Sequence, residues 1–66
     1  MSTQKATELA ERAVNSAAVG DPQFVADATV LRLNTDGTFS VCDNGEEAIA
    51  TTKEQAVQFI VENLTA

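Results

Sequence analysis

The amino-acid sequence predicts an α+β fold in which two helices pack on one face of a three-stranded antiparallel meander, in the order αβββα. Three observations lead to this prediction. Apolar residues recur at helical spacing near both ends of the chain, three short apolar runs lie between them, and two Asp/Asn-Gly turn signals separate those runs. The chain has 66 residues, and a chain of this length holds one hydrophobic core, so residues 1–66 are predicted to form a single domain.

The first helix is predicted over about residues 3–19. Ser2 or Thr3 can cap its first turn with a side-chain oxygen. Gly20 and Pro22 favour an end there, because glycine adopts the left-handed C′ conformation and proline cannot continue a helix. Most of its apolar stripe is alanine, so we expect this helix to approach its neighbour closely. The stripe consists of Ala6, Leu9, Ala10, Ala13, Val14, Ala17 and Ala18.

Two turn segments divide the middle of the chain into strands. Each has the form x-(Asp/Asn)-Gly, which fits a three-residue hairpin loop with glycine in the left-handed position. The preceding segment, residues 21–26, fits either one further helical turn or a plain loop. The predicted strands are residues 28–34, 38–42 and 46–51, and the predicted loops are residues 35–37 and 43–45.

The choice of loop length sets the register of the strands. Three-residue loops pair Leu33 with Phe39, Leu31 with Val41, Phe39 with Ile49, and Val41 with Glu47. A two-residue Asn-Gly loop would turn Ile49 outward, so burial favours the three-residue loop. One face of the predicted sheet then carries Leu31, Leu33, Phe39, Val41 and Ile49, and the other carries Val30, Arg32, Ser40, Cys42, Glu46, Ala48 and Ala50.

The second helix is predicted over about residues 52–64. A capping box can form from Thr51 with Glu54 or from Thr52 with Gln55. Phe24 and Phe59 lie outside the predicted core and either pack at its edges or flank an interface. The core is predicted to contain Leu9, Leu31, Leu33, Phe39, Val41, Ile49, Val57, Ile60 and Leu64.

The amino-acid composition argues against metal binding, disulfide formation and catalysis by a cysteine or histidine. The chain has no histidine and a single cysteine, Cys42, which excludes an internal disulfide and the common zinc ligand sets. Nothing in the sequence would activate Cys42 as a nucleophile, and we interpret it as a small apolar strand residue. The segment 34–39 matches part of a calcium-binding loop, but Arg32 would stand where calcium needs a carboxylate. We therefore expect no cofactor, no metal and no enzymatic activity.

The net charge of −6 bears on location and partners. An acidic chain is repelled by nucleic acids and anionic membranes, so we expect no direct binding to either. The unpaired cysteine and the absence of an apolar leader or an 18-residue apolar run predict a cytoplasmic protein.

The leading hypothesis is therefore a small acidic binding module, an adaptor or inhibitor that covers a surface of a larger protein partner. A basic, nucleic-acid-binding surface is one such target, which the chain would block by mimicking nucleic-acid charge. Its predicted contact residues gather at one end of the sheet: Asp27, Asp43, Glu46 and Glu47. The alternative is a structural subunit of a homodimer or larger assembly, joined through the open sheet face or an edge strand.

Overall fold

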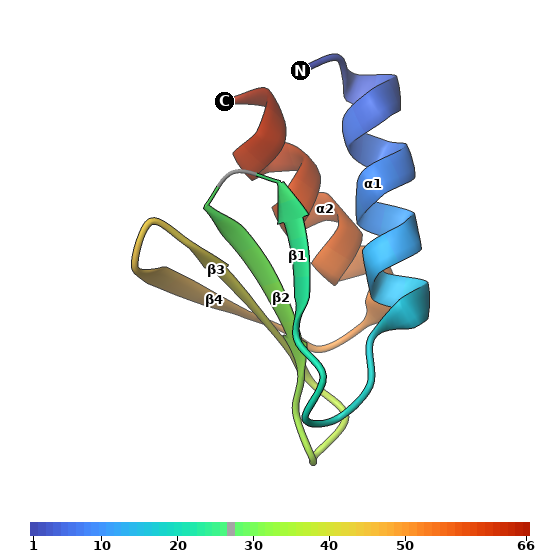
Figure 1. The fold of residues 1–66 in the computed structure, drawn as a ribbon, viewed down its shortest axis with the longest axis vertical. Coiled ribbons are helices and arrows are strands. Elements are labelled where there is room, and N and C mark those ends of the chain that lie inside the picture. Colours follow the sequence, from blue (N-terminus) through green and yellow to red (C-terminus); the bar gives the residue numbers. More distant parts are fainter. Residues whose placement is uncertain (27) are drawn as a thin grey trace.

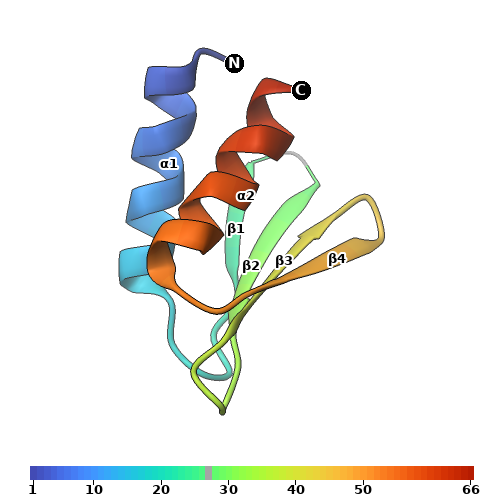
Figure 2. The same ribbon diagram turned by 180° about the vertical axis from the view of Figure 1, so that it is seen from behind.

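The computed structural model describes residues 1–26 and 28–66. Two helices lie side by side and cover one face of a four-stranded antiparallel sheet, whose strand order β1-β2-β3-β4 follows the chain (Figures 1 and 2). The α+β class and the packing of the helices on the sheet are confirmed, whereas the prediction of three strands is wrong. The elements are α1 (Thr3–Ser16), β1 (Gln23–Ala26), β2 (Thr29–Leu33), β3 (Phe39–Asp43), β4 (Glu46–Ala50) and α2 (Lys53–Thr65).

Helix α1 begins as predicted but ends earlier. The Ser2 hydroxyl caps it by accepting a hydrogen bond from the Lys5 amide at 3.2 Å. The apolar stripe continues beyond Ser16, but Ala17 is already extended, with φ −68° and ψ 139°. Beyond the helix, Val19 forms a parallel bridge with Leu33 of β2.

Helix α2 has the boundaries of the prediction to within one residue. Of the two predicted capping pairs, Thr52 with Gln55 is the one that forms, since the Thr52 hydroxyl accepts from the Gln55 amide at 3.1 Å. The Gln55 side-chain oxygen reaches back to the amide of Thr51 at 2.8 Å. Neither described helix is long and apolar enough to cross a membrane.

The additional strand is β1, in the segment predicted to be a helical turn or a loop. Gln23 pairs with Leu31 and Phe24 with Val30, and the register shifts between Phe24 and Ala26. A four-residue strand with an irregular register leaves no period-two pattern in the sequence. Pro22 just before it has no amide hydrogen to donate, which suits the start of an edge strand.

The β2–β3 hairpin has the predicted register, with Leu33 opposite Phe39 and Leu31 opposite Val41. The Gly37 amide donates to the Asn34 carbonyl at 3.1 Å, and the Asn34 amide donates to the Thr38 carbonyl at 2.8 Å. Gly37 has φ +89°, the left-handed conformation expected of the third loop residue.

The β3–β4 hairpin differs from the prediction by one residue. Phe39 lies opposite Ala50 rather than Ile49, because the loop contains only Asn44 and Gly45. Both loop residues have positive φ, 51° and 85°, as a type I′ turn requires. The one-residue shift exchanges the two faces of β4, so Ala50 is fully buried and Ile49 is 51% exposed.

The core lies between the helices and the sheet. Of the nine predicted core residues, Leu31, Phe39, Val41, Ile60 and Leu64 are buried, and Leu9, Leu33 and Val57 are half-buried against them. Ile49 is the exception. Four alanines are fully buried, which allows the helices and the sheet to approach closely: Ala6, Ala10, Ala50 and Ala56.

Candidate functional site

The predicted acidic site lies at the β3–β4 turn. Asp43 and Glu46 flank the turn as directly opposed residues, and Glu47 lies opposite Cys42. These three acids line a hollow of about 270 Å³ together with Val41, Ala48 and Asn63 of α2. The structure therefore brings Asp43, Glu46 and Glu47 together, whereas Asp27 lies outside the described residues.

The three acids differ in their surroundings. Glu46 and Glu47 are exposed, whereas Asp43 is half-buried and accepts a hydrogen bond from the Thr29 hydroxyl at 3.4 Å. Two like charges directly opposed across a hairpin disfavour the pairing slightly, so the Asp43–Glu46 pair does not strengthen the sheet. Within residues 1–26 and 28–66, no three histidine, cysteine or acidic side chains are placed to hold a metal ion. The acidic turn is therefore a charged surface whose described side chains are not arranged as a set of metal ligands.

The second candidate surface is the face of the sheet opposite the helices. Residues paired across neighbouring strands share a face, so the registers give its composition directly. We call this the open face, and it consists of two cross-strand rows. The first row is Phe24, Val30, Cys42 and Glu47, and the second is Arg32, Ser40 and Ile49.

Two large apolar side chains of the open face are exposed to solvent. Phe24 is 81% exposed and Ile49 is 51% exposed, while Val30 and Cys42 between them are half-buried. Arg32 and Glu47 contribute one charge of each sign, so this face is near neutral on a chain whose net charge is −6. Ser40 is buried, and its hydroxyl accepts a hydrogen bond from the Asn34 side chain at 3.0 Å.

The sequence prediction of this face is partly correct. Val30, Arg32, Ser40 and Cys42 lie on it as predicted. Glu46, Ala48 and Ala50 lie instead on the helix side, since the two-residue turn exchanges the faces of β4. Phe24 and Ile49 were missed. The dipeptide Asn44-Gly45 is the signal that could have placed Ile49 correctly, because Asn-Gly is the strongest short sequence signal for a two-residue hairpin.

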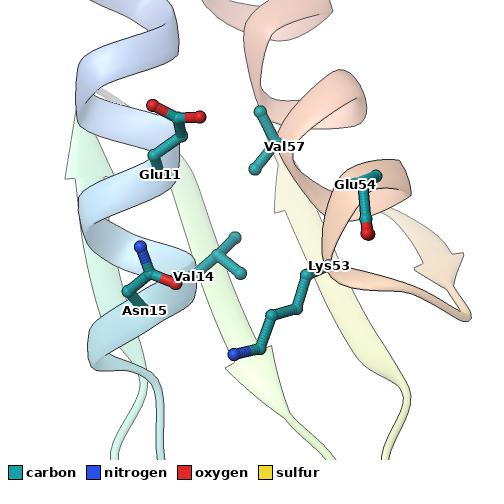
Figure 3. Close-up of a pocket in the computed structure, with 6 residues that line it drawn as sticks. All are labelled: Glu11, Val14, Asn15, Lys53, Glu54 and Val57. Carbon is teal, nitrogen blue, oxygen red and sulfur yellow. The ribbon is translucent and has the colours of Figure 1, made fainter.

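A third surface feature is a groove between the two helices (Figure 3). Val14 of α1 and Val57 of α2 form its apolar part, and the Lys53 side chain extends toward α1. The hollow has a volume of about 270 Å³, and its remaining lining is Glu11, Asn15 and Glu54. All four polar side chains are exposed, so the groove does not exclude water from a reacting group.

The two phenylalanines outside the predicted core have different environments. Phe59 is half-buried and packs against the core, whereas Phe24 projects from β1 into solvent. Comparison with protein-family models, with curated proteins and with solved structures finds no match for this chain. The open face and the acidic turn beside it are the candidate functional surfaces of the described residues.

Proposed function

We propose that this chain is a non-enzymatic protein-binding module that contacts a larger protein partner through the open face of its sheet. One observation carries the proposal: Phe24, a large aromatic residue, is 81% exposed on the same face as the half-exposed Ile49. Contiguous apolar patches on a soluble domain mark interaction sites, and aromatic residues are enriched at the energetic centre of such contacts.

The charge around the open face indicates the chemistry of the partner. Glu47 belongs to the face, and Asp43 and Glu46 lie at the same end of the hairpin on the helix side. A partner that places an apolar surface over Phe24 and Ile49 and basic groups beside the turn would complement both features. The proposed partner is therefore a protein with an apolar patch flanked by lysine or arginine.

Affinity capture with matched variants tests this proposal. The protein is immobilised as wild type, Phe24→Ser, Ile49→Ser and Val19→Ser, and retained proteins are identified by mass spectrometry. Val19 is 56% exposed and pairs with Leu33, which packs against the core, so Val19→Ser removes a similar apolar area away from the open face. A specific partner should be retained by wild type and Val19→Ser and lost with Phe24→Ser and Ile49→Ser.

The captured protein is then purified and its binding measured directly. We expect at least tenfold weaker binding by Phe24→Ser, since aromatic anchors commonly contribute more than about 1.4 kcal/mol. The association rate should fall as sodium chloride rises, because charge steering decays over about 8 Å at physiological ionic strength. A partner that binds Phe24→Ser and Ile49→Ser as tightly as wild type, with all variants folded, would refute the proposed surface.

A further inference from the structure

The free edge of β4 has an arrangement of backbone groups that matches a second copy of itself. In a two-residue hairpin the residues that flank the loop form a hydrogen-bonded pair, and such pairs alternate along the strands. The pairs Asp43–Glu46, Val41–Ala48 and Phe39–Ala50 are therefore the hydrogen-bonded ones. It follows that Glu47 and Ile49 direct their amide and carbonyl groups away from β3.

Those outward groups lie at the edge of the sheet. β4 is the last strand in the order β1-β2-β3-β4, and the backbone groups of Glu47 and Ile49 have no hydrogen-bond partner among the described residues. The side chains of β4 from Glu46 to Ile49 are all exposed. At the other edge of the sheet, β1 follows Pro22 and has a register shift, both of which hinder pairing with another strand. The regular edge is that of β4.

We propose that two copies of this chain associate by antiparallel pairing of their β4 strands about a two-fold axis at Ala48. In this register Glu47 of each copy pairs with Ile49 of the other, and all four outward groups of each strand are used in four hydrogen bonds. The result is a continuous eight-stranded sheet with both open faces on the same side. This inference does not rest on the proposed function, since the open face stays free for a partner.

The alternative two-fold registers are less favourable. An axis at Glu47 places two carboxylates directly opposite each other and requires pairing with Gly45 in the turn. An axis at Ile49 requires the amide of Thr51, which already donates to Gln55 at 2.8 Å. The axis at Ala48 opposes no like charges.

Side-chain size also favours the axis at Ala48. Ala48 would face its own copy in a non-hydrogen-bonded pair, where Cα atoms approach to about 4.5 Å. Ala48 is exposed and small enough for that approach. Glu46 would lie opposite Ala50 of the other copy, so the acids of both strands stay at the ends of the contact.

The contact is small, and the two copies carry the same net charge. The contact involves one strand of five residues from each copy, about 17 Å long. Such a contact buries much less surface than the about 1,200–2,000 Å² of a standard interface. Each copy has a net charge of −6, so repulsion opposes association and salt screens it. We therefore expect a dimer that forms at tens to hundreds of micromolar protein and that strengthens as sodium chloride rises.

Sedimentation velocity on the full chain from 10 µM to 1 mM tests the proposal. Ile49→Pro removes an outward amide without removing a hydrogen bond to β3, and it should weaken association at least tenfold. Ile49→Ser is the matched control, since it keeps the amide while removing the apolar side chain from the open face. Association lost with Ile49→Ser and Phe24→Ser but kept with Ile49→Pro would mean that the open faces pack on each other, and would overturn the proposal.

Charge exchange at Ala48 tests the axis without proline. Ala48→Glu and Ala48→Lys should each be monomeric, because like charges would meet at the axis. An equimolar mixture of these two variants should associate again, since opposite charges then meet. Wild type that remains monomeric at 1 mM in 0.3 M sodium chloride, or an unchanged association of Ala48→Glu with itself, would overturn the proposal.

Discussion

Within residues 1–26 and 28–66, Asp36 is the residue for which the fold clearly changes the pKa. Its carboxylate accepts a hydrogen bond from the Thr38 hydroxyl at 2.7 Å and another from the Thr38 amide at 3.0 Å. These bonds favour the charged form, the side-chain bond most strongly, and they lower the pKa of Asp36 below its usual value of 3.8. Because Asp36 lies at an exposed turn, the effect on stability is modest.

The pKa of Asp36 predicts a pH-dependent stability contribution of known sign. A carboxyl whose pKa is lower in the folded state stabilises the fold above its unfolded pKa, and this stabilisation is lost as pH falls through the folded pKa. Asp36→Asn keeps an acceptor oxygen but removes the charge. Urea unfolding from pH 7 to pH 2 should show wild type more stable than Asp36→Asn near neutrality, with the difference shrinking as the pH falls below 3.8. A difference that stays constant with pH would show that the charge does not contribute.

At the scale of the element, the β3–β4 turn determines which face of β4 is buried. Gly45 has φ 85°, a conformation that costs an L-residue about 1–2 kcal/mol. A Cβ added to Gly45 would have no other described heavy atom within 4 Å, so sterics with neighbours add nothing to that cost. The glycine is therefore required by its backbone conformation and not by lack of space around it.

Substitution of Gly45 should therefore separate conformation from packing. We expect Gly45→Ala to lower the free energy of unfolding by about 1–2 kcal/mol. D-alanine at the same position, introduced by chemical synthesis, prefers positive φ and should be at least as stable as wild type. Both are measured by thermal or urea unfolding. Equal destabilisation by the L- and D-residues would mean that the added methyl group clashes.

The elements could be predicted from the sequence where the pattern was long or the turn chemistry was complete. Both helices have apolar periodicity over at least three turns, and the β2–β3 loop has its glycine at the required position. β1 could not be predicted, because it has only four residues, of which Phe24 is exposed and the other three are partly buried, so they show no period-two alternation. The predicted β3–β4 register is wrong, since Phe39 pairs with Ala50, because burial of Ile49 is a weaker constraint on the loop than the local Asn-Gly preference. That local preference is the stronger constraint, since Ala50 fills the core position instead.

The candidate site also has one part that the sequence predicts and one part that it does not. The gathering of Asp43, Glu46 and Glu47 at one turn requires only that a hairpin closes there, and the sequence predicts that. The exposure of Phe24 depends on β1, which has no clear pattern in the sequence, and the exposure of Ile49 depends on the register that the Asn44-Gly45 turn sets. Composition alone cannot distinguish an apolar residue of the core from one on an uncovered face.

At the scale of the whole molecule, two helices from opposite ends of the chain complete the core. Ala10 of α1 and Ala56 of α2 are both fully buried, and the helices pack on each other along much of their length (Figure 2). A core with alanine at several contact positions leaves little room for a larger side chain.

Enlarging Ala10 should therefore destabilise the fold. We expect Ala10→Leu to lower the free energy of unfolding by about 1–3 kcal/mol through overpacking, although alanine and leucine have similar helix propensities. Gln4→Leu, at an exposed position of the same helix, is the control and should stay within about 0.5 kcal/mol of wild type. Urea unfolding measures both. Wild-type stability of Ala10→Leu would show that the helices separate without cost.

The strand order also bears on how quickly the chain folds. Each strand pairs with the next strand along the chain, so the sheet assembles from contacts between near neighbours in sequence. The contact between α1 and α2 instead joins residues that the whole sheet separates, and closing so long a loop carries an entropy cost until the sheet has formed. The first helix should therefore dock late, after the rate-limiting barrier. Substitutions on its buried face then mainly accelerate unfolding and leave the refolding rate nearly unchanged.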